Sequence, residues 1–123
     1  MKPGKTGITR IVKAFSYSMK GLRFAWQHEA AFRQECFLAL VLVPLAYFIS
    51  ENAVQLVLLI LPIFIVLIVE LLNSAIEAAI DRHGEELHVL SGAAKDIGSA
   101  AVFVSMILLG LIWLIILFDI FLG

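Results

Sequence analysis

The segment Glu70-Leu-Leu-Asn73-Ser74-Ala-Ile-Glu77-Ala-Ala-Ile-Asp81 continues a long apolar run and adds five polar side chains to it. An α-helix turns about 100° per residue, so these five side chains fall on one face and leave an apolar face opposite. Ionisable groups inside a membrane are costly and usually face a protein interior or a water-filled cavity. The segment therefore predicts a long helix with a functional polar face.

The composition of the chain is that of a membrane protein. Of its 123 residues, 62% are hydrophobic and 15% are charged, and the mean hydropathy is +1.02. Soluble domains are about 45–50% apolar. At this length we expect a single domain over residues 1–123. The single cysteine, Cys36, excludes an intrachain disulfide, and we expect no nucleic-acid partner.

The pattern along the chain predicts an all-α membrane protein with a surface helix and three transmembrane helices. Residues 8–28 place apolar side chains on one face of a helix and basic side chains on the other, which is typical of an amphipathic helix lying in the membrane interface. Three apolar runs follow, at about 30–49, 53–80 and 97–118, each long enough to cross a bilayer. The segment 81–96 is expected to be a polar loop or interfacial segment broken by Gly84 and Gly92.

The distribution of positive charge predicts the orientation in the membrane. All nine Lys and Arg residues lie before the first span or between the second and third spans. By the positive-inside rule, the N-terminus and the segment 81–96 are cytoplasmic. The polar face then meets the cytoplasmic surface of the membrane.

The acids on the polar face suggest a metal site. Glu70 and Glu77, with Glu29 from another segment, could supply oxygen ligands to Mg²⁺ while substrate phosphates and waters complete its shell. A structural alternative is that the acids only pair with Arg33, Arg82 or Lys95. The chain has no P-loop and no dinucleotide-binding glycine motif. The residues alone thus predict an acidic interfacial site and do not name a substrate.

Five stretches carry a resemblance to a known family: residues 6–10, 17–23, 29–35, 70–82 and 90–101. Together they closely resemble the prokaryotic integral-membrane diacylglycerol kinases over nearly the whole chain. The Glu-x-x-Asn-[Ser/Thr]-Ala-x-Glu element is shared with the related undecaprenol kinases. The sequence departs from the family's pattern at Leu87, where an aromatic is familiar, and at Phe48, where tryptophan is.

The resemblance implies a homotrimeric, Mg²⁺-dependent enzyme of the bacterial inner membrane that moves the γ-phosphate of ATP to the 3-hydroxyl of diacylglycerol. It implies Glu70 as general base, Glu29 and Glu77 as metal ligands, and Asn73 and Asp81 in support. The nucleotide contacts that it implies are Arg10, Tyr17, Glu29, Glu77, Glu86, Leu87, His88, Lys95 and Asp96. The lipid contacts that it implies are Arg10, Ser18, Met19, Arg23, Trp26, Phe32, Arg33, Gln34, Glu35, Phe48, Glu70, Ser99 and Trp113.

Two other classes of protein compete with a lipid kinase. In a small transporter or channel subunit, intramembrane acids would carry protons or cations and would lie near the bilayer midplane. Here Glu70, Glu77 and Asp81 are expected to lie progressively closer to the cytoplasmic surface and away from the bilayer midplane. A regulatory membrane peptide without chemistry would not need its polar residues on one stripe.

Overall fold

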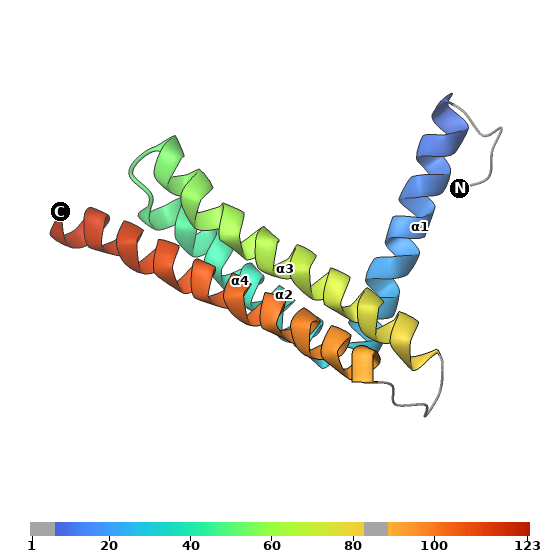
Figure 1. Ribbon diagram of the computed structural model, residues 1–123. Helices are drawn as coiled ribbons and strands as arrows, with labels where there is room; N and C mark the ends of the chain where they lie inside the picture. Colours follow the sequence, from blue (N-terminus) through green and yellow to red (C-terminus); the bar gives the residue numbers. More distant parts are fainter. Residues whose placement is uncertain (1–6, 83–88) are drawn as a thin grey trace.

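The computed structural model describes residues 7–82 and 89–123, which form four α-helices (Figure 1). Their bounds are α1 Gly7–His28, α2 Ala30–Ile49, α3 Ala53–Asp81 and α4 Val89–Leu122. The last three lie side by side, and α1 projects from one end of this bundle at a steep angle. The predicted all-α fold class is therefore confirmed.

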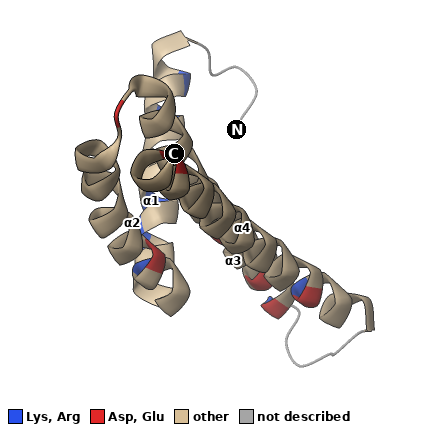
Figure 2. Cartoon of the chain, turned by 90° about the vertical axis from the view of Figure 1, so that its left-hand side faces the viewer, with Lys and Arg blue, Asp and Glu red and all other residues tan. Residues whose placement is uncertain are grey.

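The helices α2, α3 and α4 are long and apolar enough to cross a membrane. Residues 53–69 of α3 and residues 97–118 of α4 carry no Lys, Arg, Asp or Glu (Figure 2). Pro44 and Pro62 both lie inside helices that continue through them, because neighbouring helices can compensate for a lost backbone hydrogen bond. The chain is a multi-pass membrane protein.

The helix α3 packs against both α2 and α4 and forms the centre of the bundle. Buried apolar side chains from all three helices make one core: Ala46, Leu59, Ile63, Val66, Leu109, Trp113 and Ile116. Within it, the indole Nε1 of Trp113 donates a hydrogen bond to the carbonyl oxygen of Leu59 over 2.9 Å. This bond joins α4 to α3 in the middle of the apolar region.

The connection between α2 and α3 carries a second polar tie. Asn52 caps α3, because its side-chain oxygen accepts a hydrogen bond from the backbone N–H of Gln55 over 2.9 Å. The Gln55 side chain is buried, and its Nε2 donates to Oδ2 of Asp119 over 3.0 Å. Asp119 lies near the end of α4. The hydrogen bond from Gln55 to Asp119 thus joins α3 to α4 at the end of the bundle away from Glu70.

The start of α4 differs from the sequence-based expectation. The segment up to residue 96 was expected to be a loop or interfacial segment, but α4 begins at Val89 and includes Gly92. A glycine inside a helix costs about 1 kcal/mol relative to alanine, which does not end a helix by itself. Helix-favouring Ala93 and Ala94 follow, and Lys95 contacts α3. Contacts between helices therefore outweigh the local preference.

Candidate functional site

The polar face of α3 is turned into the protein at one end and toward solvent at the other. Glu70, Asn73 and Ser74 are 4%, 8% and 7% exposed, Glu77 is half-buried and Asp81 is exposed. The apolar Leu72 on the other side of the helix is 61% exposed. The polar side chains predicted to share one face therefore do so, and this face is the interior one.

Glu70 lies at the buried end of this face, between Ser74 and a second acid. The hydroxyl of Ser74 donates to Oε2 of Glu70 over 3.5 Å, which is a long hydrogen bond. Glu35, on α2, is the second acid, and its carboxyl group is near enough to that of Glu70 for the two to interact electrostatically. Oε1 of Glu35 is fully buried and accepts no hydrogen bond from the described residues. Two carboxyl groups from different helices thus meet at the centre of the site.

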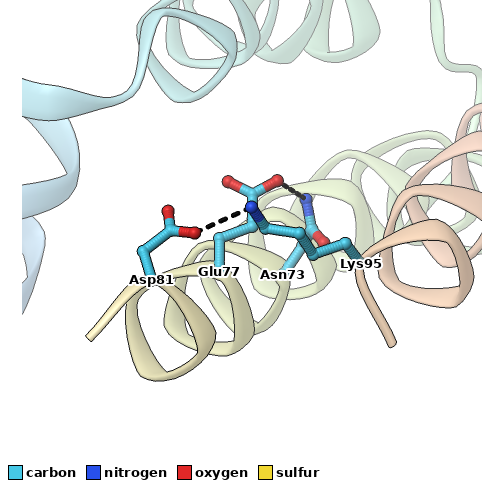
Figure 3. Close-up of polar contacts among 4 residues, drawn as sticks. All are labelled: Asn73, Glu77, Asp81 and Lys95. Atoms are coloured by element: carbon cyan, nitrogen blue, oxygen red, sulfur yellow. Dashed lines mark hydrogen bonds and ion pairs between the residues drawn. The ribbon is translucent and has the colours of Figure 1, made fainter. Parts of the chain in front are cut away.

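Asn73 connects α3 with α4 at the same level. Its amide Nδ2 donates to Oε1 of Glu77 over 3.4 Å (Figure 3). Its Oδ1 is buried without a donor among the described residues and lies against Gly98 on α4. A side chain at position 98 would collide with this oxygen. The small residue is needed for this close approach of the helices.

Lys95 reaches from α4 to the exposed end of the polar face. Its Nζ lies 2.7 Å from Oδ1 of Asp81 (Figure 3). Among residues 7–82 and 89–123, this is the one ion pair between side chains. The guanidinium of Arg33 instead donates to the carbonyl oxygen of Trp26 over 2.6 Å. Within the described part of the chain, the alternative that the acids only pair with cations therefore holds for Asp81 and not for Glu70 or Glu77.

The residues expected to bind a metal come from two places. Glu77 is on α3, and Glu29 lies at the junction of α1 and α2, where its side chain makes no capping hydrogen bond. The described parts of the chain bring no three His, Cys, Asp or Glu side chains into one metal-binding group. Mg²⁺ commonly takes only one or two protein carboxylates and completes its shell with waters and phosphates. A metal held by Glu29 and Glu77 therefore stays a prediction from the sequence.

A cavity of about 480 Å³ lies between α1 and α3. Ser74 lines it and also bonds to Glu70, so the cavity reaches the acidic site. Its other lining residues are mostly small or apolar: Ser18, Gly21, Leu22, Phe24, Ala25, Leu71, Ala75 and Ala78. Except for Ser18, the sequence analysis did not assign these residues to a site. Facing small residues on the two helices are the signal that could have indicated the open space.

Several predicted contact residues lie on the surface of α1 or near the site. Arg10, Tyr17, Ser18, Met19, Arg23 and Trp26 are exposed on α1. At the start of α2, Phe32 is buried and Gln34 is exposed, and Asp96 and Ser99 are exposed on α4. Glu86, Leu87 and His88 lie outside the described residues.

Two predicted lipid contacts lie far along the bundle from Glu70. Phe48 is 80% exposed near the end of α2, about 20 Å along the helix from Glu35 at 1.5 Å per residue. Trp113 is 8% exposed within the core, where it bonds to Leu59. The structure explains Trp113 by packing and does not bring either residue to the acidic site.

Comparison with known proteins assigns the chain to a family. The family model described as prokaryotic diacylglycerol kinase matches residues 16–117. The diacylglycerol kinase of Escherichia coli is 52% identical over 119 residues, covering 97% of this chain and 98% of that protein. The Haemophilus influenzae enzyme of the same name is 47% identical and covers 92% of this chain and 96% of its own. The chain therefore belongs to the prokaryotic diacylglycerol kinase family.

Proposed function

We propose that this protein transfers the γ-phosphate of ATP to the 3-hydroxyl of diacylglycerol and so forms phosphatidic acid at the cytoplasmic surface of the bacterial inner membrane. The observation that carries the proposal is the position of Glu70. This carboxyl group is 4% exposed and is linked through Ser74 to an apolar cavity. An apolar cavity beside a buried carboxylate suits a lipid alcohol, because the alcohol's proton needs an acceptor that water does not already occupy.

Glu70 acts as the general base in this proposal. It accepts the proton of the lipid hydroxyl while the hydroxyl oxygen forms a bond to the γ-phosphorus. The bond between that phosphorus and the β,γ-bridging oxygen breaks, and ADP leaves. Asn73 bonds to Glu77 and lies one helical turn from Glu70, where it maintains the order of the polar face.

Cations complete the site by balancing phosphate charge. Glu77 and Glu29 would hold Mg²⁺ together with the nucleotide, and the metal would neutralise charge that develops on the phosphoryl group. Lys95 and Arg10 are the basic residues assigned to the phosphates. Asp81 holds Lys95 at the exposed end of the polar face, with 2.7 Å between their polar atoms. Tyr17, Asp96 and residues 86–88 are proposed to contact the remainder of the nucleotide.

The lipid is proposed to enter between α1 and α3. Cavities that hold small molecules measure about 300–1,000 Å³, and the space here of about 480 Å³ suits a glycerol headgroup with the first part of its acyl chains. Ser18 lines the cavity from α1. The remaining assigned lipid contacts on α1 and α2 would lie along the acyl chains. In this arrangement α1 lies in the membrane interface and the basic N-terminal side faces the cytoplasm.

The proposal is tested by transfer of labelled γ-phosphate from Mg·ATP by purified protein in mixed micelles. Diacylglycerol and undecaprenol are offered in parallel. We expect label in phosphatidic acid, loss of transfer by at least about 100-fold in Glu70→Gln, and weaker Mg·ATP binding in Glu77→Gln. The isosteric amide keeps the shape of Glu70 but cannot accept the proton.

Each contrary outcome of this assay has a definite meaning. Full activity in folded Glu70→Gln would exclude Glu70 as the base. Label only in undecaprenyl phosphate would make undecaprenol the acceptor. Label in neither lipid would contradict the kinase proposal and would favour a transporter. Glu51→Gln serves as the matched control, because Glu51 is an exposed acid in the connection between α2 and α3.

A further inference from the structure

The junction between α1 and α2 is a break of a single residue, Glu29. The first helix ends at His28 and the second begins at Ala30. Glu29 has extended backbone angles, with φ −119° and ψ 104°, so the chain turns here and α1 leaves the bundle at a steep angle (Figure 1). The angle at this junction therefore determines where α1 lies relative to the other three helices.

A side chain of α2 reaches back across the junction and bonds to the last turn of α1. Nη1 of Arg33 donates a hydrogen bond to the carbonyl oxygen of Trp26 over 2.6 Å. The last four carbonyl groups of a helix have no N–H partner within that helix, and Trp26 holds one of these four positions in α1. These carbonyl oxygens carry partial negative charge, which a nearby cation stabilises. Arg33 therefore closes the C-terminal end of α1 from the neighbouring helix.

Trp26 is also held by its ring. The rings of Trp26 and Phe37 have centroids 6.1 Å apart and an interplanar angle of 50°, which is within the range of about 4.5–7 Å for favourable aromatic pairs. Phe37 follows Arg33 by four residues, so the two lie on the same face of α2. One face of α2 thus contacts both the backbone and the side chain of a single residue of α1.

Trp26 lies between the cavity and the junction. Ala25, the residue before it, lines the cavity. The carbonyl oxygen of Ala25 also accepts a hydrogen bond from the backbone N–H of Glu29 over 2.9 Å. A movement of Trp26 away from Arg33 would therefore move one wall of the cavity together with the residue that is expected to hold a metal.

We propose that Arg33 is a positioning residue, which holds α1 at its resting angle to α2 and thereby sets the width of the cavity and the position of Glu29. The resemblance to the family implies a direct lipid contact for Arg33, whereas its guanidinium here bonds to the protein itself. Arg33 then acts on the lipid and on Mg·ATP through α1. The effect on the two substrates rests on the proposed function, but the effect on the angle does not.

The angle is tested by measuring the distance between spin labels on the two helices, which needs no kinase activity. Cys36→Ala removes the native thiol, and Lys13→Cys on α1 and Leu40→Cys on α2 supply exposed labelling sites. These sites lie about 24 Å and about 16 Å along their helices from Glu29 at 1.5 Å per residue, so a change of angle changes their separation. Labelled protein is diluted with unlabelled protein so that each assembly holds one labelled chain.

We expect a narrow distance distribution with native Arg33 and one about twofold broader or more in Arg33→Gln, which lacks the positive charge. Arg33→Lys should restore most of the narrow distribution, because lysine keeps a charged donor and the contact is a single hydrogen bond. The matched control is Lys20→Gln, which removes a cation from α1 away from the junction. An unchanged distribution in Arg33→Gln, no restoration in Arg33→Lys, or equal broadening in Lys20→Gln would overturn the proposal.

Kinetic measurements separate positioning from direct contact with the lipid. Arg33→Gln should raise the KM for Mg·ATP about threefold or more, together with the KM for diacylglycerol, because Glu29 and the cavity wall move together. A rise confined to the KM for diacylglycerol would overturn the proposal and make Arg33 a direct lipid contact. If kinase activity itself is absent, the proposed function fails, and the distance measurement still decides whether Arg33 fixes the junction.

Discussion

At the scale of single residues, the site depends on how closely α4 approaches α3 as much as on the charges of its side chains. Gly98 lies where α4 comes nearest to the polar face of α3, in contact with the buried oxygen of Asn73. Asn73 in turn bonds to Glu77. A glycine with no catalytic group thus determines where an amide and a carboxylate lie.

We predict that Gly98→Ala destabilises the protein by about 1–3 kcal/mol, because the added methyl group would displace Asn73. The matched control is Gly92→Ala in the same helix, where an added Cβ meets nothing within 4 Å. That change should stabilise the helix by up to about 1 kcal/mol. Thermal unfolding in detergent micelles measures both. Equal effects of the two substitutions would show that the contact with Asn73 does not constrain position 98.

The polar face itself could be predicted from the sequence, whereas its partners from other helices could not. The turn of about 100° per residue is enough to place Glu70, Asn73 and Glu77 together. The meeting of Glu35 with Glu70 depends on how α2 packs against α3. The fit of Gly98 against Asn73 depends in the same way on α4. These contacts arise from packing, which spacing along one helix does not encode.

At the scale of helices, the length of an apolar run is a good predictor of where a helix lies. The charged residues beside the run are a poor predictor of where the helix begins and ends. The expected spans at 30–49 and 53–80 correspond to α2 and α3, whose bounds are Ala30–Ile49 and Ala53–Asp81. The third was expected at 97–118, but α4 runs from Val89 to Leu122. Its added turns contain Lys95 and Asp119, each of which bonds to α3. Charged residues therefore extend this helix by contacts that its own sequence does not reveal.

The hydrogen bond from Trp113 to Leu59 gives a second prediction at this scale. Trp113→Phe keeps most of the apolar packing but removes the Nε1 donor, so it should destabilise the fold by about 0.5–1.5 kcal/mol. Trp26→Phe is the control, because Trp26 is 44% exposed on α1. Its effect on unfolding should be within about 0.5 kcal/mol. If Trp113→Phe instead leaves stability unchanged and raises the KM for the lipid, the residue is a lipid contact.

At the scale of the whole molecule, one chain leaves most of its apolar surface uncovered. Only 11%, 33% and 17% of the spanning windows of α2, α3 and α4 are buried inside the single copy. These surfaces must face lipid or other copies of the chain. The number of spans can be predicted from the length of the apolar runs in the sequence. Which part of the apolar surface faces lipid and which part faces protein cannot be predicted in this way, because lipid tails are as apolar as the side chains.

We predict that the active form is an oligomer, because three helices alone form a thin wall around a buried acidic site, and the resemblance to the family implies that this oligomer is a homotrimer. Chemical crosslinking and native mass measurement in mild detergent should give a species of about three chains, and dilution into monomers should lower activity. Denatured protein at the same concentration is the control for random crosslinking. A monomer with full activity would contradict this prediction.

The ties between α3 and α4 also determine which part of the molecule is able to move. Gln55 with Asp119, Leu59 with Trp113, and Asn73 with Gly98 join the two helices at separate heights, spanning about 27 Å of α3 at 1.5 Å per residue. Moving α4 along α3 by one helical turn would break all three contacts at once, so we expect the two helices to behave as one rigid unit. The helix α1 packs mainly against α2 and borders the cavity. We therefore expect that admitting a molecule from the membrane into the cavity requires α1 to move, while α3 and α4 stay in place.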